Sequence, residues 1–162
     1  MKEYHKAIND YSKAIELYPE YTEALHNRGN AYFLLRRYDT AIKDYSKVIK
    51  LEPAFYLAYY NRGIAFDEID EYEKAVHDYT FAIELNPDLT QAYNNRAISF
   101  RLLGQLENSI ADYNKAIEMK PGYETANENR QEVLDHRVNI VLSKKGRYYK
   151  HLRELLNKAH KP

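Results

Sequence analysis

An asparagine followed by an arginine recurs along the chain at one spacing, and both side chains carry polar chemistry. An amide offers two donors and an acceptor, so a row of asparagines can hydrogen-bond the backbone of an extended peptide. An arginine placed in an apolar helix stripe needs a partner. The evenly spaced pairs are Asn27-Arg28, Asn61-Arg62, Asn95-Arg96 and Asn129-Arg130.

Residue types that perform covalent or metal chemistry are missing or unsuitably spaced. The chain has no cysteine, which excludes disulfides and cysteine-held zinc. Its six histidines form no helical His-x-x-x-His pair. Neither a glycine-rich phosphate loop nor a nucleophile elbow occurs. We therefore predict a protein that is not an enzyme and that uses no cofactor or metal.

Composition and charge fit one folded unit. The 162 residues are 44% hydrophobic, and 24 basic side chains balance 24 acidic ones. Zero net charge gives no overall attraction to nucleic acid or membrane, and no apolar run approaches the roughly 18 residues of a membrane span. We expect a cytoplasmic protein whose native N-terminus can lie upstream of Met1, with no membrane partner and no nucleic-acid partner.

Residues that shape a fold keep the same period as the Asn-Arg pairs. A constant period of about 34 residues that combines small and large residues with proline is typical of a helix–turn–helix repeat that stacks into a solenoid. Proline cannot continue a helix and ends each unit. The recurring residues are Pro19, Pro53, Pro87 and Pro121; Tyr11, Tyr45, Tyr79 and Tyr113; and Ala7, Ala41, Ala75 and Ser109.

This pattern resembles the tetratricopeptide repeat family over nearly the whole chain. With positions counted from the start of each repeat, three full copies begin at Thr22, Tyr56 and Thr90. The family's position 8 is small, position 11 aromatic, position 20 small and position 32 proline in these copies. The resemblance implies an all-α, right-handed superhelical solenoid of antiparallel helix pairs.

The predicted organisation has incomplete ends. Residues 1–21 form a half repeat with only a second helix, and residues 22–55, 56–89 and 90–123 are full repeats. Residues 124–162 form a lengthened, degenerate closing repeat. Within it we expect a turn at Lys145-Gly146, followed by a basic capping helix from Arg147 to His160.

The arginines stand at repeat position 7, where the family usually has leucine. Repeats with Asn-Arg there and Asp at position 23 look like those of co-chaperones. We expect a partly buried Arg–Asp pair in each repeat, such as Arg62 with Asp78, which specifies the register of the helices. Pairs of this kind often add little net stability, whereas removing one partner is costly.

The asparagines lie about 100° further round the first helix, on a stripe that faces the concave groove in this family. The repeat domain of O-GlcNAc transferase is similar, with an asparagine ladder at this position. A structural alternative is that each asparagine bonds the neighbouring repeat, and the two roles are compatible. The predicted peptide-binding residues are Asn27, Asn61, Asn95, Asn129, His26, Asn30, Tyr60, Ile64, Asn94, Ile98 and Arg101.

Co-chaperone repeats hold a C-terminal carboxylate of heat-shock chaperones with two asparagines and three cations. The asparagines match Asn30 and Asn61, but the cationic positions fall on His26, Gln91 and Asn95, so such a clamp is not expected. We predict a non-enzymatic protein–protein interaction scaffold that binds an extended peptide or partner segment. Alternatives are self-association through the uncapped N-terminal helix, and binding of an acidic partner by the basic C-terminal helix.

Overall fold

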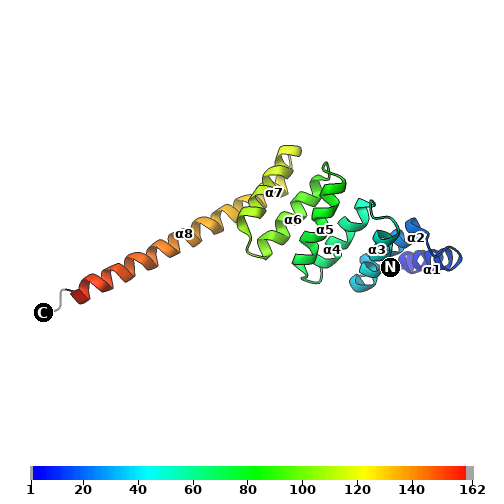
Figure 1. The fold of residues 1–162 in the computed structure, drawn as a ribbon, viewed down its shortest axis with the longest axis horizontal. Helices are drawn as coiled ribbons and strands as arrows, with labels where there is room; N and C mark the ends of the chain where they lie inside the picture. The colour runs from blue at the N-terminus through cyan, green and yellow to red at the C-terminus, as the bar shows by residue number, and fades with distance from the viewer. Residues whose placement is uncertain (1, 160–162) are drawn as a thin grey trace.

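A computed structural model describes residues 2–159 of the chain and the side chains of residues 2–150. The described residues form eight α-helices and no strand (Figure 1). The helices are α1 (Lys2–Leu17), α2 (Thr22–Leu34), α3 (Tyr38–Leu51), α4 (Tyr56–Asp67), α5 (Tyr72–Leu85), α6 (Thr90–Leu102), α7 (Leu106–Met119) and α8 (Glu124–Ala159).

Each helix packs on the next one along the chain, and the pairs stack into an elongated array (Figure 1). Helices α2, α4, α6 and α8 also contact one another in succession. No such contact joins α3 to α5 or α5 to α7 in the part of the chain described. The odd-numbered helices therefore splay apart on the outside, while α2, α4, α6 and the start of α8 line an inner face. The predicted all-α solenoid of stacked helix pairs is confirmed.

The turn inside each helix pair uses one residue in the left-handed conformation. Arg36, Asp70 and Gly104 have φ angles of 57°, 60° and 72°. In the first turn, the N–H of Arg37 donates to the carbonyl of Tyr32 at 2.9 Å, which closes the end of α2. Equivalent bonds close α4 and α6. This backbone cap ends the first helix of every full repeat at the same place.

A buried tyrosine fills the space between the two helices of each full repeat. Tyr45 and Tyr79 are almost completely buried. A Cβ atom added to Gly29 would lie 2.7 Å from Cε1 of Tyr45, and one added to Gly63 would lie 2.8 Å from Cε1 of Tyr79. The small residue at position 8 is therefore required by the close approach of the tyrosine ring.

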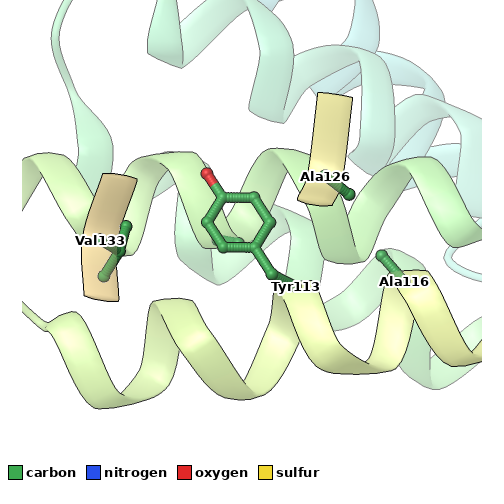
Figure 2. Packing of buried hydrophobic residues seen from close by; sticks show 5 residues of the cluster. Tyr113, Ala116, Ala126 and Val133 are labelled. Atoms are coloured by element: carbon green, nitrogen blue, oxygen red, sulfur yellow. The ribbon is translucent and has the colours of Figure 1, made fainter. Parts of the chain in front are cut away.

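The third tyrosine joins the last full repeat to α8. Tyr113 and Ala116 of α7 are fully buried together with Ala126 and Val133 of α8 (Figure 2). The first part of α8 thus packs as the first helix of a further repeat would.

The predicted turn at Lys145-Gly146 is wrong, because α8 continues as one helix to Ala159 and projects away from the array (Figure 1). One glycine costs a helix only about 1 kcal/mol, and its neighbours are helix formers. The predicted capping helix therefore does not turn back onto the repeats, and its final residue, His160, lies outside the described residues. Among the described helices, none is both long and apolar enough to cross a membrane.

Two valines of α8 provide a matched test of this geometry. Val133 is 1% exposed and Val141 is 47% exposed. We expect Val133→Ala to lower the free energy of unfolding by about 1–3 kcal/mol, because it leaves a cavity. Val141→Ala should change it by less than about 0.5 kcal/mol. Urea denaturation followed by circular dichroism measures both. An equal loss for Val141→Ala would show that the end of α8 packs on the repeats.

Candidate functional site

The arginine of each full repeat forms a two-pronged ion pair across its helix hairpin. Nε of Arg62 donates to Oδ2 of Asp78 at 2.6 Å, and Nη2 donates to Oδ1 at 2.7 Å. The Asp78 side chain is 1% exposed, and that of Arg62 is 18% exposed. The other two pairs have the same geometry, so the predicted pairs are confirmed: Arg28 with Asp44 and Arg96 with Asp112.

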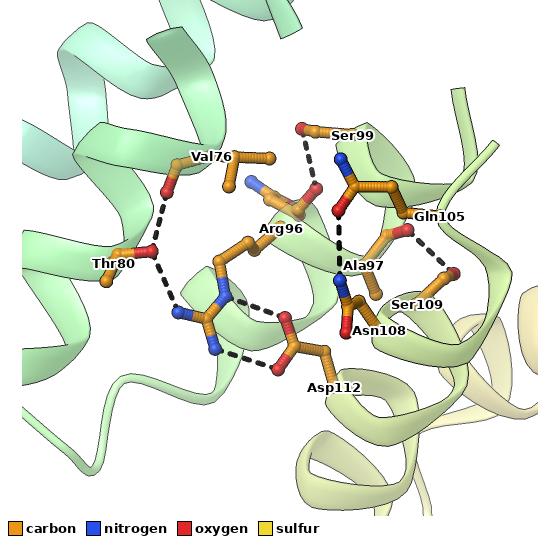
Figure 3. A network of polar contacts seen from close by, with 10 residues as sticks. Val76, Thr80, Arg96, Ala97, Ser99, Gln105, Asn108, Ser109 and Asp112 are labelled. Atoms are coloured by element: carbon orange, nitrogen blue, oxygen red, sulfur yellow. Dashed lines mark hydrogen bonds and ion pairs between the residues drawn. The ribbon is translucent and has the colours of Figure 1, made fainter. Parts of the chain in front are cut away.

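Each of these arginines also reaches the preceding repeat, which the sequence analysis missed. Nη1 of Arg96 donates to the Thr80 hydroxyl at 3.0 Å, and that hydroxyl donates to the carbonyl of Val76 at 2.7 Å (Figure 3). Arg62 bonds Ser46 in the same way. A hydroxyl residue recurs 16 positions before each arginine, so the signal was present. The guanidinium therefore joins three helices.

Arg130 on α8 is the exception. Its Nη1 donates to Asn114 at 2.8 Å, but its Nε is buried without a hydrogen-bond partner. Gly146 stands where the spacing of the other repeats would place the aspartate. The ion pair is missing because α8 neither turns nor supplies the acid.

Two of the asparagines bond the preceding repeat. Nδ2 of Asn61 lies 2.9 Å from Nε2 of His26 and donates to Oδ1 of Asn30 at 3.1 Å. Nδ2 of Asn95 donates to the Tyr60 hydroxyl at 3.3 Å. The amide donors thus tie repeat to repeat. Oδ1 of Asn61 has no hydrogen-bond partner among the described residues, so an acceptor remains for a ligand.

The remaining amides differ in their access to solvent. Asn27 is exposed and Asn129 partly exposed, and neither side chain forms a hydrogen bond with another described residue. Asn94 is only 4% exposed, and its Nδ2 donates to Oδ1 of Asn95 at 3.2 Å. Asn94 therefore lies beneath the surface, not in the groove as predicted.

Two hollows bring several predicted residues together. The first is about 260 Å³ and brings Asn30, Asn61 and Ile64 together at the junction of the first two full repeats. The second is about 380 Å³, lies between α6 and α8, and includes Arg101. The other two predicted residues are half-buried: Tyr60 packs on Tyr79, and Ile98 on the cluster around Tyr113. The inner face thus carries separate polar side chains on successive repeats.

Comparison with known proteins identifies the repeat. The sequence profile of the tetratricopeptide repeat matches residues 22–55, 56–89 and 90–123, and a further TPR repeat profile matches residues 1–36. The chain belongs to the tetratricopeptide repeat family. No curated protein sequence is significantly similar to it.

Solved structures with the same fold include proteins with bound peptides. The crystal structure of MamA is 26% identical, with a TM-score of 0.83, over 99% of this chain and 93% of that one. The first TPR of Spaghetti (RPAP3), bound to an HSP90 peptide, is 27% identical, with a TM-score of 0.71, over 72% and 93%. The second TPR domain of human RPAP3, in complex with an HSP70 peptide, is 29% identical, with a TM-score of 0.66, over 67% and 91%.

The ion pair yields a stability prediction. Arg62→Leu restores the family's usual residue but leaves Asp78 buried without its partner. We expect the free energy of unfolding to fall by about 2–4 kcal/mol, because an uncompensated buried charge is costly. Adding Asp78→Leu should recover most of the loss. Urea denaturation of the two variants measures this, and a silent Arg62→Leu would show that the pair is effectively solvated.

His26 yields a prediction about pH. Burial lowers the pKa of His26, whose ring packs edge-on against Phe55 with centroids 5.1 Å apart. The unfolded chain, with a histidine pKa of about 6.5, then binds more protons than the folded one in the window below that value. Stability should therefore fall as the pH is lowered from about 7 to about 5.

The test compares His26→Gln with the wild type in urea at several pH values. The free energy of unfolding of His26→Gln should fall less than that of the wild type as the pH is lowered, because the titrating ring is gone. His5→Gln, at an exposed position of α1, controls for the loss of a histidine. Equal pH slopes in wild type and His26→Gln would contradict the assignment.

Proposed function

We propose that the chain is a non-enzymatic scaffold whose inner face binds an extended peptide or partner segment. The observation that carries this proposal is the set of polar side chains that successive repeats place on α2, α4 and α6. The free acceptor of Asn61 can receive a backbone N–H of a peptide. The apolar walls beside it, such as Ile64, can bury a ligand side chain. Together they suit a ligand without regular structure of its own.

Neighbouring structures support peptide binding but not the same ligand. The titles of the two RPAP3 structures name HSP90 and HSP70 peptides. This chain lacks the three cations of a carboxylate clamp. His26 is also held against Tyr45 and Phe55, where burial lowers its pKa and favours its neutral form. We therefore propose a partner other than the C-terminus of those chaperones.

Self-association through the N-terminal end is a second candidate. Leu17 and Tyr18, where α1 ends, are 74% and 68% exposed, and Tyr21 beside them is 45% exposed. These residues line one apolar hollow. Sedimentation velocity over a range of protein concentrations tests the candidate, because self-association would raise the sedimentation coefficient with concentration.

The peptide proposal is tested by changing two asparagines. A peptide selected from a display library against the chain serves as the probe, titrated by calorimetry. Asn61→Ala with Asn95→Ala should raise its dissociation constant by about five- to a hundredfold, because each lost hydrogen-bonding side chain contributes about 0.5–1.5 kcal/mol. Asn9→Ala, at an exposed position of α1, is the matched control and should have no effect.

Circular dichroism and thermal denaturation show whether the double variant stays folded. Unchanged affinity in a folded double variant would contradict the ladder. Unfolding of the double variant would assign both asparagines to repeat-to-repeat packing alone.

A further inference from the structure

The buried tyrosine of each full repeat ends in a hydroxyl that needs an acceptor. The Tyr45 hydroxyl donates to Oδ1 of Asn30 at 2.8 Å, and the Tyr79 hydroxyl donates to Oδ2 of Asp67 at 2.6 Å. The Tyr113 hydroxyl is buried with no hydrogen-bond partner, and Figure 2 shows it directed away from α7. A buried hydroxyl without a partner costs free energy. The third full repeat therefore lacks an acceptor that the first two possess.

The acceptors at the first two junctions each collect two donors. Oδ1 of Asn30 receives Tyr45 and also Nδ2 of Asn61 from the next repeat. Asp67 receives Tyr79 and also the hydroxyl of Ser99 from the next repeat, at 2.7 Å. At both junctions, one side chain of the inner face therefore accepts hydrogen bonds from the buried tyrosine and from the next repeat.

At the third junction the chemistry is reversed. Arg101 stands one full repeat after Asp67, and Val133 stands one full repeat after Ser99. The carboxylate of Asp67 is thus replaced by the guanidinium of Arg101, and the hydroxyl of Ser99 is replaced by the apolar side chain of Val133. Arg101 and the Tyr113 hydroxyl now meet with no carboxylate or amide oxygen between them to accept the hydroxyl proton.

Arg101 has no acidic partner in the part of the chain that the structure describes. Its Nε is buried without a hydrogen bond, and no carboxylate lies within 4.0 Å of its nitrogens. Burial raises the pKa of Tyr113, and the neighbouring charge of Arg101 opposes that rise. The arginines of the three Arg–Asp pairs, by contrast, are each neutralised by an aspartate. Arg101 is therefore a cation whose counter-charge is still to be supplied.

The surrounding hollow has room for a ligand side chain. It is about 380 Å³, within the range of small-ligand sites. Val133, Leu106 and Ile140 supply apolar walls, and Glu132 and His136 also line it. The carboxylate of Glu132 is the one negative charge among the lining residues, so it opposes an anionic ligand.

We propose that this hollow is a subsite for a carboxylate of the bound partner, held by Arg101 with the Tyr113 hydroxyl as a second donor. The inference rests on the proposed peptide-binding function. The ligand carboxylate would supply, from outside, the acceptor that Asp67 supplies at the preceding junction. The carboxylate comes either from an aspartate or glutamate side chain or from a peptide C-terminus.

Small carboxylates test the subsite without a known partner. N-acetyl-glutamate amide represents a side-chain carboxylate, N-acetyl-glycine a terminal one, and N-acetyl-glutamine amide is the neutral control. Each is titrated into isotope-labelled protein while the Nε–Hε signal of Arg101 is followed by NMR. We expect a saturable shift with at least one carboxylate and none with the neutral amide. The carboxylate that binds more tightly identifies the source.

Variants then locate the binding. A variant that lacks Arg101 also lacks its side-chain signal, so the backbone amide signals of neighbouring residues report binding there. Arg101→Gln should weaken carboxylate binding at least about tenfold, because a charge-assisted bond is removed. Arg147→Gln, an exposed arginine of α8, should leave it unchanged. Glu132→Gln should strengthen it by removing the opposing charge, and unchanged or weaker binding would contradict the placement. No saturable shift, or an equal shift with the neutral amide, would overturn the subsite.

The display-selected peptides separate this inference from the proposed function. Suppose that a selected peptide shifts the side-chain signals of Asn61 but not the signal of Arg101, and that Arg101→Gln does not change its affinity. That result would support groove binding and overturn the subsite. Peptides that shift neither residue would contradict groove binding, while the small carboxylates still decide the subsite independently.

Discussion

The neutralised arginine of each full repeat is the constraint on which the arrangement of the inner face depends. A buried guanidinium must be paired, and the one on Arg62 is satisfied in two directions, by Asp78 across the hairpin and by Ser46 in the preceding repeat. Its flat group also lies over the Tyr59 and Phe66 rings, about 6 Å from each centroid. These contacts set how α4 is rotated about its axis, and that rotation turns the adjacent Asn61 toward the groove.

The sequence predicted this framework well because its partners recur at fixed offsets. Arg62 and Asp78 are separated by one hairpin, so a single period placed both. The end of α8 was different, since the sequence in hand offers no later copy to compare it with. Gly146 was interpreted as a turn, although one glycine among helix-forming residues is tolerated. Helix propensity decided the outcome, together with the lack of a helix packed against the later part of α8 among the described residues, and neither is periodic.

The details of the groove were less predictable, because they depend on side chains of the preceding repeat. Helical geometry, together with the resemblance to the tetratricopeptide repeat family, predicted Asn61 on the inner face. Whether its amide was free depended on His26 and Asn30, which lie about one repeat earlier in sequence. Asn94 is next to Asn95 on the same helix, yet it is buried. The periodic pattern shows the residues that stay the same, such as the buried tyrosine. It does not show that the side chain accepting a hydrogen bond from that tyrosine differs between repeats.

That difference shows how a repeat protein can separate stability from recognition. The Arg–Asp pairs, the small residues at position 8 and the rings of the buried tyrosines pack the interior in nearly the same way in each full repeat. The inner-face position that holds Asp67 is less constrained, because it is Phe33 in the first full repeat and Arg101 in the third. Because the backbone supports an aromatic ring, a carboxylate or a guanidinium at this position, the sign of the charge can change along the groove without a change of fold. A bound chain would therefore meet a different chemistry at each junction, and the one at Arg101 is complete only when the ligand brings the negative charge.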